Sequence, residues 1–176
     1  IDLGNYCNLA CKMCNPLASS RIASQHKIWN IIDDEPCNWT ENHEVWQRFL
    51  DELINIPKLK NIHFMGGETL IQPRFEECID FLILNNRTDL CISFVCNGTK
   101  YNHSLLEKLK KFTRVGIELS IETAGESNNY IRQGTNTNQV LDNIKQYQEF
   151  CNGTTISLTL RPVLTSLSAR DYWQVV

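Results

Sequence analysis

Short runs of β-branched and aliphatic residues alternate along the chain with longer segments in which apolar residues recur every three or four positions. The short runs predict strands over residues 1–5, 60–66, 91–96, 114–121 and 155–164. The longer segments predict amphipathic helices over residues 43–56, 73–85, 103–112 and 137–150. A further helix is predicted to begin near Ser168. Strands that alternate with helices in this order favour a parallel sheet in an α/β domain.

The segment 15–42 interrupts this alternation between the first two predicted strands. Its pattern predicts a helix around residues 17–32, followed by a turn-rich run over residues 33–38. We interpret the segment as an elaborated first crossover that lies over one end of the sheet. An ordinary connecting helix with its loop fits this pattern, and so does a lid over a substrate.

The composition predicts one soluble globular domain over residues 1–176. The chain carries 17 Lys and Arg against 20 Asp and Glu, a net charge of −3, and 42% of its residues are hydrophobic. No apolar run approaches the roughly 18 residues that a membrane-spanning helix needs, which excludes a membrane protein. The mildly acidic balance gives no strong signal for nucleic-acid binding, because the phosphate backbone attracts a basic surface.

Eight cysteines are the unusual feature of the composition, at positions 7, 11, 14, 37, 78, 91, 96 and 151. An even number fits a disulfide framework, but no signal peptide is visible and a chain of this length can bury enough surface without disulfides. We therefore predict a cytoplasmic protein with reduced thiols, and interpret the start without Met as that of a fragment. The cysteines at 78, 91, 96 and 151 are predicted to act as small buried hydrophobes.

Three of the cysteines lie on one loop directly after the first predicted strand. Cys7, Cys11 and Cys14 have the spacing C-x3-C-x2-C, so their thiolates can converge on one inorganic centre. Soft thiolates select zinc or an iron–sulfur cluster. Three protein ligands leave one metal position open for an exogenous ligand. A structural zinc site needs a fourth ligand, for which Cys37 is the nearest further cysteine.

This triplet resembles the cluster loop of the radical S-adenosylmethionine (radical SAM) superfamily, and the Cys7-Asn8-Leu9 opening is similar to members with a SPASM or twitch auxiliary-cluster domain. The resemblance implies a partial (β/α) TIM-like barrel of parallel strands, here truncated after the fifth strand. It implies a [4Fe–4S] cluster on the three cysteines, with SAM bound to the fourth iron. One electron from a flavodoxin- or ferredoxin-type donor then splits SAM into methionine and a 5′-deoxyadenosyl radical, which takes a hydrogen atom from the substrate.

Further motifs of the family fall at the carboxyl ends of the predicted strands, the edge where parallel α/β sheets place their sites. The run Gly66-Gly67-Glu68-Thr69 resembles the GGE motif. The resemblance implies that Glu68 and the adjacent backbone bind the SAM amino group, since glycines allow close approach and a carboxylate accepts hydrogen bonds from an ammonium group. Taken alone, this run would indicate a tight turn.

Later strand ends extend the resemblance. Asn97 begins an Asn-Gly-Thr run and is similar to a polar residue near the SAM site, although Asn-Gly also favours a plain turn. Ser120 and Glu122 resemble the residues that reach the ribose hydroxyls, with a loop cap as the alternative. Arg132 resembles the arginine that pairs with the SAM carboxylate, with a surface salt bridge as the alternative.

Two adenine contacts depart from the family pattern. Met13 stands where many relatives place an aromatic residue, and its adaptable thioether can fill that role. Val163 is assigned to the adenine from the fifth predicted strand, although its surroundings do not match the family motif. Arg161 fits an anionic substrate group and an ordinary surface position equally well. No catalytic residue is assigned.

The substrate is set by regions that the motifs do not cover. The Cys-Asn-Leu opening favours a peptide or protein, with a nucleoside, RNA or a small metabolite as alternatives. A non-catalytic iron–sulfur scaffold and a zinc protein are hypotheses of a different class. The presence of Glu68, Ser120, Glu122 and Arg132 together favours the SAM-cleaving hypothesis, because a scaffold needs no SAM cradle.

Overall fold

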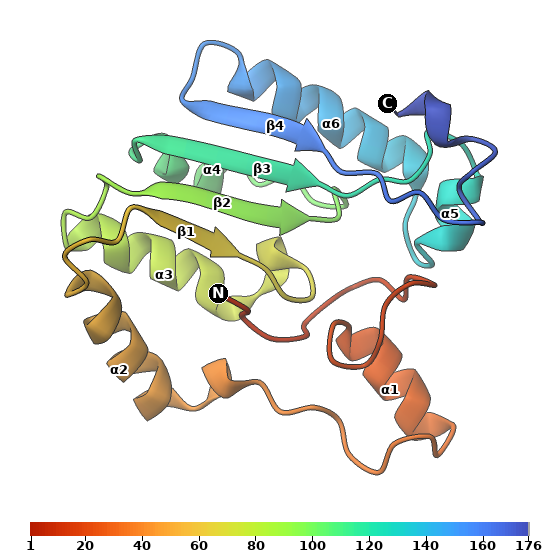
Figure 1. The fold of residues 1–176 in the computed structure, drawn as a ribbon, viewed down its shortest axis with the longest axis horizontal. Coiled ribbons are helices and arrows are strands. Elements are labelled where there is room, and N and C mark those ends of the chain that lie inside the picture. Colours follow the sequence, from red (N-terminus) through yellow and green to blue (C-terminus); the bar gives the residue numbers. More distant parts are fainter. Residues whose placement is uncertain (176) are drawn as a thin grey trace.

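A computed structural model describes residues 1–175, and the last residue of the predicted domain, 176, lies outside the described residues. The fold is built on a parallel sheet in which consecutive strands are neighbours (Figure 1). Its four strands are β1 (Asn61–Phe64), β2 (Cys91–Cys96), β3 (Arg114–Leu119) and β4 (Ile156–Leu160). Each of these lies inside a predicted strand, and the predicted parallel α/β arrangement is confirmed.

Four helices form where the apolar spacing predicts them. They are α2 (His43–Ile54), α3 (Pro73–Leu84), α4 (His103–Leu109) and α6 (Thr137–Cys151). Three of them begin at an asparagine whose side chain accepts a backbone N–H of the first turn, namely Asn42, Asn102 and Asn136. Asparagine is among the best residues at this position, which explains where these helices start. No helix within residues 1–175 combines the length and apolar character that a bilayer crossing requires.

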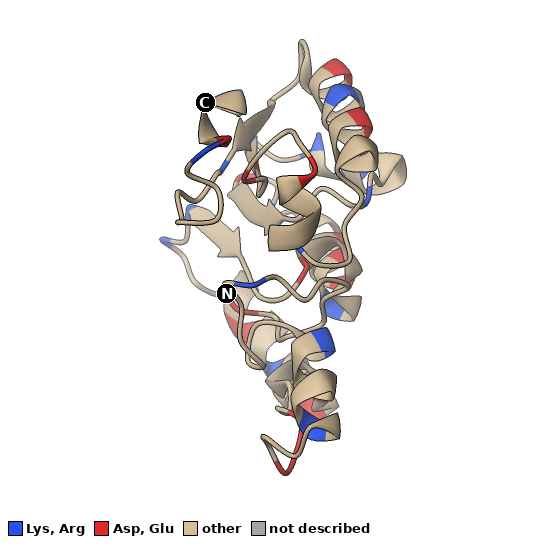
Figure 2. Ribbon diagram, turned by 90° about the vertical axis from the view of Figure 1, so that its right-hand side faces the viewer, with Lys and Arg blue, Asp and Glu red and all other residues tan. Residues whose placement is uncertain are grey.

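The two faces of the sheet differ in chemistry, because successive strand residues point to opposite sides. The face under the helices is apolar and buried, with Ile62, Phe64, Phe94, Ile117 and Leu119. The opposite face carries half-buried polar side chains, among them His63, Ser93 and Glu118. Ser93 and Glu118 line a cavity of about 310 Å³ on this face. In Figure 2, which turns the molecule by 90°, basic and acidic residues are interspersed along the helices.

The predicted strand over residues 1–5 is reduced to one parallel bridge, between Asp2 and Met65, at which the Leu3 N–H donates to the Met65 carbonyl (3.0 Å) and the Met65 N–H donates to the Ile1 carbonyl (2.9 Å). Side chains of the elaborated crossover bond to three further backbone groups of this segment. The amide oxygen of Asn38 accepts the Asn5 N–H (2.7 Å), the Trp39 indole N–H donates to the Asp2 carbonyl (2.8 Å), and the Thr40 hydroxyl donates to the Leu3 carbonyl (2.9 Å). These side-chain bonds add to the backbone bonds with the end of β1, so the segment runs extended beside β1 with a single bridge.

Two predicted helices differ from the structure. The helix expected around residues 17–32 is shorter, α1 (Ser20–Ile28), because the Ser19 hydroxyl caps its start and Asn30 turns the chain with a φ of 54°. The helix expected near Ser168 is replaced by turns and a single 3-10 turn (Tyr172–Gln174). There the Ser168 hydroxyl donates to the Val163 carbonyl (3.0 Å) and accepts the Thr165 N–H (2.9 Å). A serine that bonds nearby backbone in this way competes with helix formation.

Candidate cluster and cofactor site

The cysteine loop runs from the extended N-terminal segment past the carboxyl end of the sheet to α1 (Figure 1). Side chains at the start of α1 hold it from one side. The Ser20 hydroxyl accepts the Cys7 N–H (3.1 Å), and the Ser19 hydroxyl donates to the Leu9 carbonyl (2.6 Å). Each bond satisfies a polar group that an irregular loop would otherwise leave without a partner.

Backbone bonds hold the same loop from the opposite side. The Ala10 N–H donates to the Gln133 carbonyl (2.9 Å), and the Lys12 N–H donates to the Ile131 carbonyl (2.8 Å). These two carbonyls belong to the last residue of α5 (Ser127–Ile131) and to the segment just after it. The sequence did not predict this helix. The loop is therefore fixed between two segments more than 110 residues apart in the chain.

All eight cysteines are free thiols, and those of the loop differ in exposure: Cys7 is half-buried, Cys11 buried and Cys14 exposed. Burial raises the pKa of the Cys7 thiol. The Cys14 pKa is lowered to about 7, first by a hydrogen bond with the Cys11 thiol and also by the positive charge of Arg132. The same hydrogen bond raises the pKa of the Cys11 thiol, whereas the charge of Arg132 acts toward the thiolate, the form that binds metal.

Zinc coordination by this loop and Cys37 finds no support in the geometry. Within residues 1–175, no three or more His, Cys, Asp or Glu side chains are gathered closely enough for one metal ion. Cys37 itself is exposed, with its sulfur 3.9 Å from the Asn38 carbonyl. Three thiolates on one loop are the donor set that an iron–sulfur cluster takes.

The two glycines after β1 let two backbones approach each other closely. Gly67 donates its N–H to the Gly4 carbonyl (2.7 Å), and Glu68 donates to the Tyr6 carbonyl (2.7 Å). A Cβ on Gly67 would overlap the Tyr6 carbonyl oxygen, and one on Gly66, which has a φ of 121°, would lie 2.5 Å from the Gly4 carbonyl oxygen. The structure thus gives both glycines a packing role beside the SAM contact predicted for them.

Substitution of Gly67 by alanine is expected to lower the free energy of unfolding by about 1–3 kcal/mol, since the overlapping atoms belong to backbone. The matched control is Gly116→Ala on β3, where the added Cβ would make an ordinary contact at 3.5 Å with Ser93. This control is expected to change stability by less than about 1 kcal/mol. Urea unfolding measures both, and equal losses would contradict the steric explanation.

Glu68 is a buried carboxylate that links the ends of β1 and β2. One oxygen accepts the Leu70 N–H (3.0 Å) and the other accepts the Asn97 N–H (2.6 Å). Burial raises the pKa of Glu68 to about 7 although these bonds act in the opposite direction. The contact between Glu68 and the SAM amino group stays a prediction. The neighbouring Thr69 is buried, and its hydroxyl has no hydrogen-bond partner among the described residues.

The raised pKa of Glu68 predicts a pH dependence of stability. Between its ordinary value of 4.5 and about 7, the folded state holds a proton that the unfolded state has lost, so stability falls as the pH rises through this window. The parent is expected to lose roughly 3 kcal/mol there from this residue, and Glu68→Gln is expected to lack that contribution. Urea unfolding at pH 5 and pH 8 tests this, and parallel losses in both proteins would contradict it.

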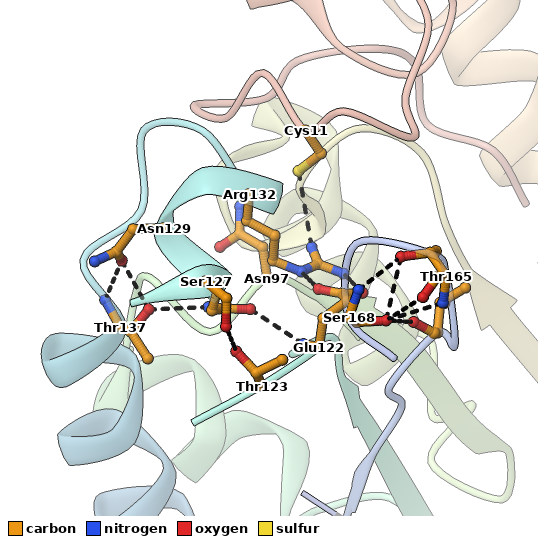
Figure 3. Close-up of polar contacts among 12 residues, drawn as sticks. Cys11, Asn97, Glu122, Thr123, Ser127, Asn129, Arg132, Thr137, Thr165 and Ser168 are labelled. Carbon is orange, nitrogen blue, oxygen red and sulfur yellow. Dashed lines mark hydrogen bonds and ion pairs between the residues drawn. The ribbon is translucent and has the colours of Figure 1, made fainter. Parts of the chain in front are cut away.

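Arg132 and Glu122 form a buried ion pair (Figure 3). Arg132 donates from Nε to one carboxylate oxygen of Glu122 and from Nη2 to the other (2.9 Å). Its remaining nitrogen, Nη1, lies 3.9 Å from the Cys11 sulfur. The Glu122 side chain is 0% exposed and that of Arg132 11%. The structure therefore joins two residues for which separate SAM contacts were predicted, and directs the third guanidinium nitrogen at the cluster loop.

Three residues that the sequence did not single out hold this pair in place. The Asn128 side chain accepts the Glu122 N–H (3.1 Å) and donates to the Thr137 hydroxyl (3.1 Å). That hydroxyl donates in turn to Asn129 (2.7 Å), so α5 is tied to the start of α6 (Figure 3). Asparagine-rich turns gave no signal of this network, because the same residues cap helices elsewhere in the chain.

Comparison with known proteins identifies the family to which the chain belongs. The sequence profile described as Radical SAM superfamily matches residues 1–166. The chain belongs to the radical SAM superfamily. Membership implies a [4Fe–4S] cluster and SAM. No curated protein matches the sequence.

Solved structures share the radical SAM fold of this chain. Native anSMEcpe with bound AdoMet has a TM-score of 0.69 at 21% identity, over 98% of this chain and 45% of that one. Streptococcus suis SuiB bound to S-adenosylmethionine has a TM-score of 0.63 at 18% identity, over 97% of this chain and 34% of that one. These likenesses confirm the predicted partial barrel, and the chain spans less than half the length of either relative.

The other predicted SAM contacts of this radical SAM domain lie at loop positions on the carboxyl edge of the sheet. The Ser120 N–H donates to the Cys96 carbonyl (2.8 Å), which fixes its backbone one residue beyond β3. Met13 is 41% exposed, and Val163 is 50% exposed in the loop after β4. Arg161 forms an ion pair with Glu118. The roles of Ser120, Met13 and Val163 toward SAM stay predictions.

Proposed function

We propose that the protein is a radical SAM enzyme that cleaves SAM reductively at a [4Fe–4S] cluster. The observation that carries the proposal is the convergence of the cysteine loop, Glu68, Asn97 and the Glu122–Arg132 pair at one edge of the sheet. When bound, the cluster and SAM supply a 5′-deoxyadenosyl radical that abstracts hydrogen from the substrate. Cys7, Cys11 and Cys14 would hold the cluster and leave one iron without a protein ligand.

The protein's own groups have distinct tasks in this proposal. Arg132 offers Nη1 toward the cluster loop while Glu122 holds its other two donor groups, so its planar fork has a fixed direction for the SAM carboxylate. Its positive charge also helps to lower the pKa of Cys14. Backbone groups around Gly67 and the Glu68 side chain would receive the SAM amino group.

A peptide or protein is the substrate class that we propose. The fold is shared with SuiB bound to precursor peptide SuiA and with anSMEcpe bound to the Kp18Cys peptide. The polar face of the sheet offers hydroxyl, imidazole and carboxylate groups, which suit the amide groups of a peptide. The subgroup with a SPASM or twitch domain is proposed from the Cys-Asn-Leu opening. A flavodoxin- or ferredoxin-type donor and a cytoplasmic location complete the proposal, since the ligands are reduced thiols.

Anaerobic reconstitution followed by metal analysis and chromatography tests this function. We expect iron and sulfide at about four per chain, and formation of 5′-deoxyadenosine after dithionite and SAM are added. Reduced flavodoxin in place of dithionite tests the electron donor. A loaded, folded protein that binds SAM without forming 5′-deoxyadenosine would favour the scaffold hypothesis, and zinc at about one per chain would favour the zinc hypothesis.

A further inference from the structure

Three side chains near the cluster loop close a ring of hydrogen bonds. The amide nitrogen of Asn97 donates to the amide oxygen of Asn8 (2.8 Å), and the amide nitrogen of Asn8 donates to the Thr99 hydroxyl (2.9 Å). That hydroxyl donates back to the amide oxygen of Asn97 (2.7 Å). Every side chain in the ring donates once and accepts within it, so the three bonds reinforce one another.

The ring joins the cysteine loop to a turn that is itself rigidly held. Asn8 directly follows Cys7, while Asn97 and Thr99 lie in the turn after β2. Gly98 has a φ of 73° in this turn, and its carbonyl accepts the buried Asn143 side chain of α6 (2.9 Å). The backbone of Asn97 also donates to Glu68. A displacement of Asn8 would therefore move the predicted ligand Cys7 relative to the fixed turn after β2.

The same geometry limits what Asn97 can offer to SAM. Its side-chain oxygen already accepts both the Thr99 hydroxyl and the Thr99 N–H (3.0 Å), and one amide hydrogen is used on Asn8. An amide oxygen has two acceptor positions, so no acceptor is left for SAM. Asn97 is also buried, at 6% exposure. The Asn97 side chain is therefore engaged by Asn8 and Thr99 and not by the ligand.

We propose that Asn8, Asn97 and Thr99 form a positioning ring that sets the cysteine loop against the SAM site, and that Asn97 serves SAM through Asn8. The inference rests on the proposed function and deepens it. Thr99 and Asn8 are positioning residues in this assignment, because they affect SAM binding through Cys7, the residue before Asn8. Loss of any member breaks two of the three bonds in the ring and leaves a loop adjacent to a metal ligand free to shift.

The test uses Thr99→Val, which keeps the shape and removes the hydroxyl, with Thr99→Ser as the matched control that retains it. Dissociation of SAM from the anaerobically reconstituted full chain is measured by equilibrium dialysis, and the reduced cluster by electron paramagnetic resonance with and without SAM. We expect Thr99→Val and Asn8→Ala each to weaken SAM binding about fivefold to tenfold and to alter the spectrum. Thr99→Ser should match the parent, and Asn8→Ala/Thr99→Val should be no weaker than either single variant.

Two outcomes would overturn the assignment, and a third would overturn the proposed function on which it rests. Weaker SAM binding in Asn97→Ala alone, with Asn8→Ala and Thr99→Val equal to the parent, would mean that Asn97 contacts SAM directly. A lower melting temperature in Thr99→Val, with unchanged SAM affinity and spectrum at a temperature where all proteins are folded, would mean that the ring is merely structural. Absence of a cluster in the parent protein would overturn the proposed function. This failure is distinguished from failure of the ring because it is seen in the parent before any variant is measured.

Discussion

Alanine in place of Cys11 is expected to abolish 5′-deoxyadenosine formation, because two thiolates on the loop cannot hold a [4Fe–4S] cluster that requires three. Cys11 is the buried member of the triplet, and its thiol is hydrogen-bonded with Cys14 and close to Arg132. Iron and sulfide content after reconstitution should fall with activity. The measurement is chromatography of the product under dithionite and SAM, alongside the absorption of the cluster.

Cys91→Ala is the matched control for this loss. Cys91 is a half-buried thiol at the start of β2, at the opposite end of that strand from the site. Removal of its sulfur is expected to leave iron content and product formation near those of the parent, with a cost in stability of about 1 kcal/mol. Equal loss of the cluster in both variants would show that the loop is not the ligand set.

Glu122→Gln is expected to lower the free energy of unfolding by about 3–5 kcal/mol, the typical cost of leaving a buried charge without its partner. Glutamine would turn an amide nitrogen toward a guanidinium that has only donors, so at least one of the two bonds to Arg132 is lost. Because Arg132 then loses its fixed direction, SAM binding to the reconstituted protein should fall as well. Urea unfolding and equilibrium dialysis measure the two effects.

The exposed ion pair of the same chain is the control for the buried one. Glu118 and Arg161 have side chains that are 28% and 55% exposed, and they lie across neighbouring strands. Solvent screens such a pair, so Glu118→Gln is expected to cost at most about 1 kcal/mol and to leave SAM binding unchanged. A loss in Glu118→Gln as large as that in Glu122→Gln would show that burial is not the cause.

The helices and the sheet were predictable because their signals lie within a few residues of one another. Apolar spacing identified α2, α3, α4 and α6, and asparagine caps placed the starts of three of them. The alternation of strands with helices along the chain predicted a parallel sheet, and the structure shows its strands in consecutive order. The cysteine spacing was equally local, so it identified the cluster loop before any fold was known.

Residues 1–5 show where this reasoning fails. Their composition is that of a strand, yet only Asp2 forms a bridge with the sheet, and the side chains of Asn38, Trp39 and Thr40 bond to further backbone groups of the segment. Side chains offer the same donors and acceptors as backbone. Nothing in a short apolar run indicates which of the two will form hydrogen bonds with its backbone. α5 was missed for a related reason, since five residues are too few to show a helical period.

The sequence by itself determined the parallel α/β class and the family of the chain, and it predicted the three thiol ligands. Only the tertiary structure decided how the polar residues of the site are paired: Glu122 with Arg132, Glu68 with the backbone of Asn97, and Asn8 with Asn97 and Thr99. The physical reason is that the spacing of apolar residues reports which face of one helix or strand is buried. A carboxylate or an amide oxygen, in contrast, accepts a hydrogen bond from any donor within reach. The path of the chain, which brings residues 89 and 91 positions apart into contact, selects the partner.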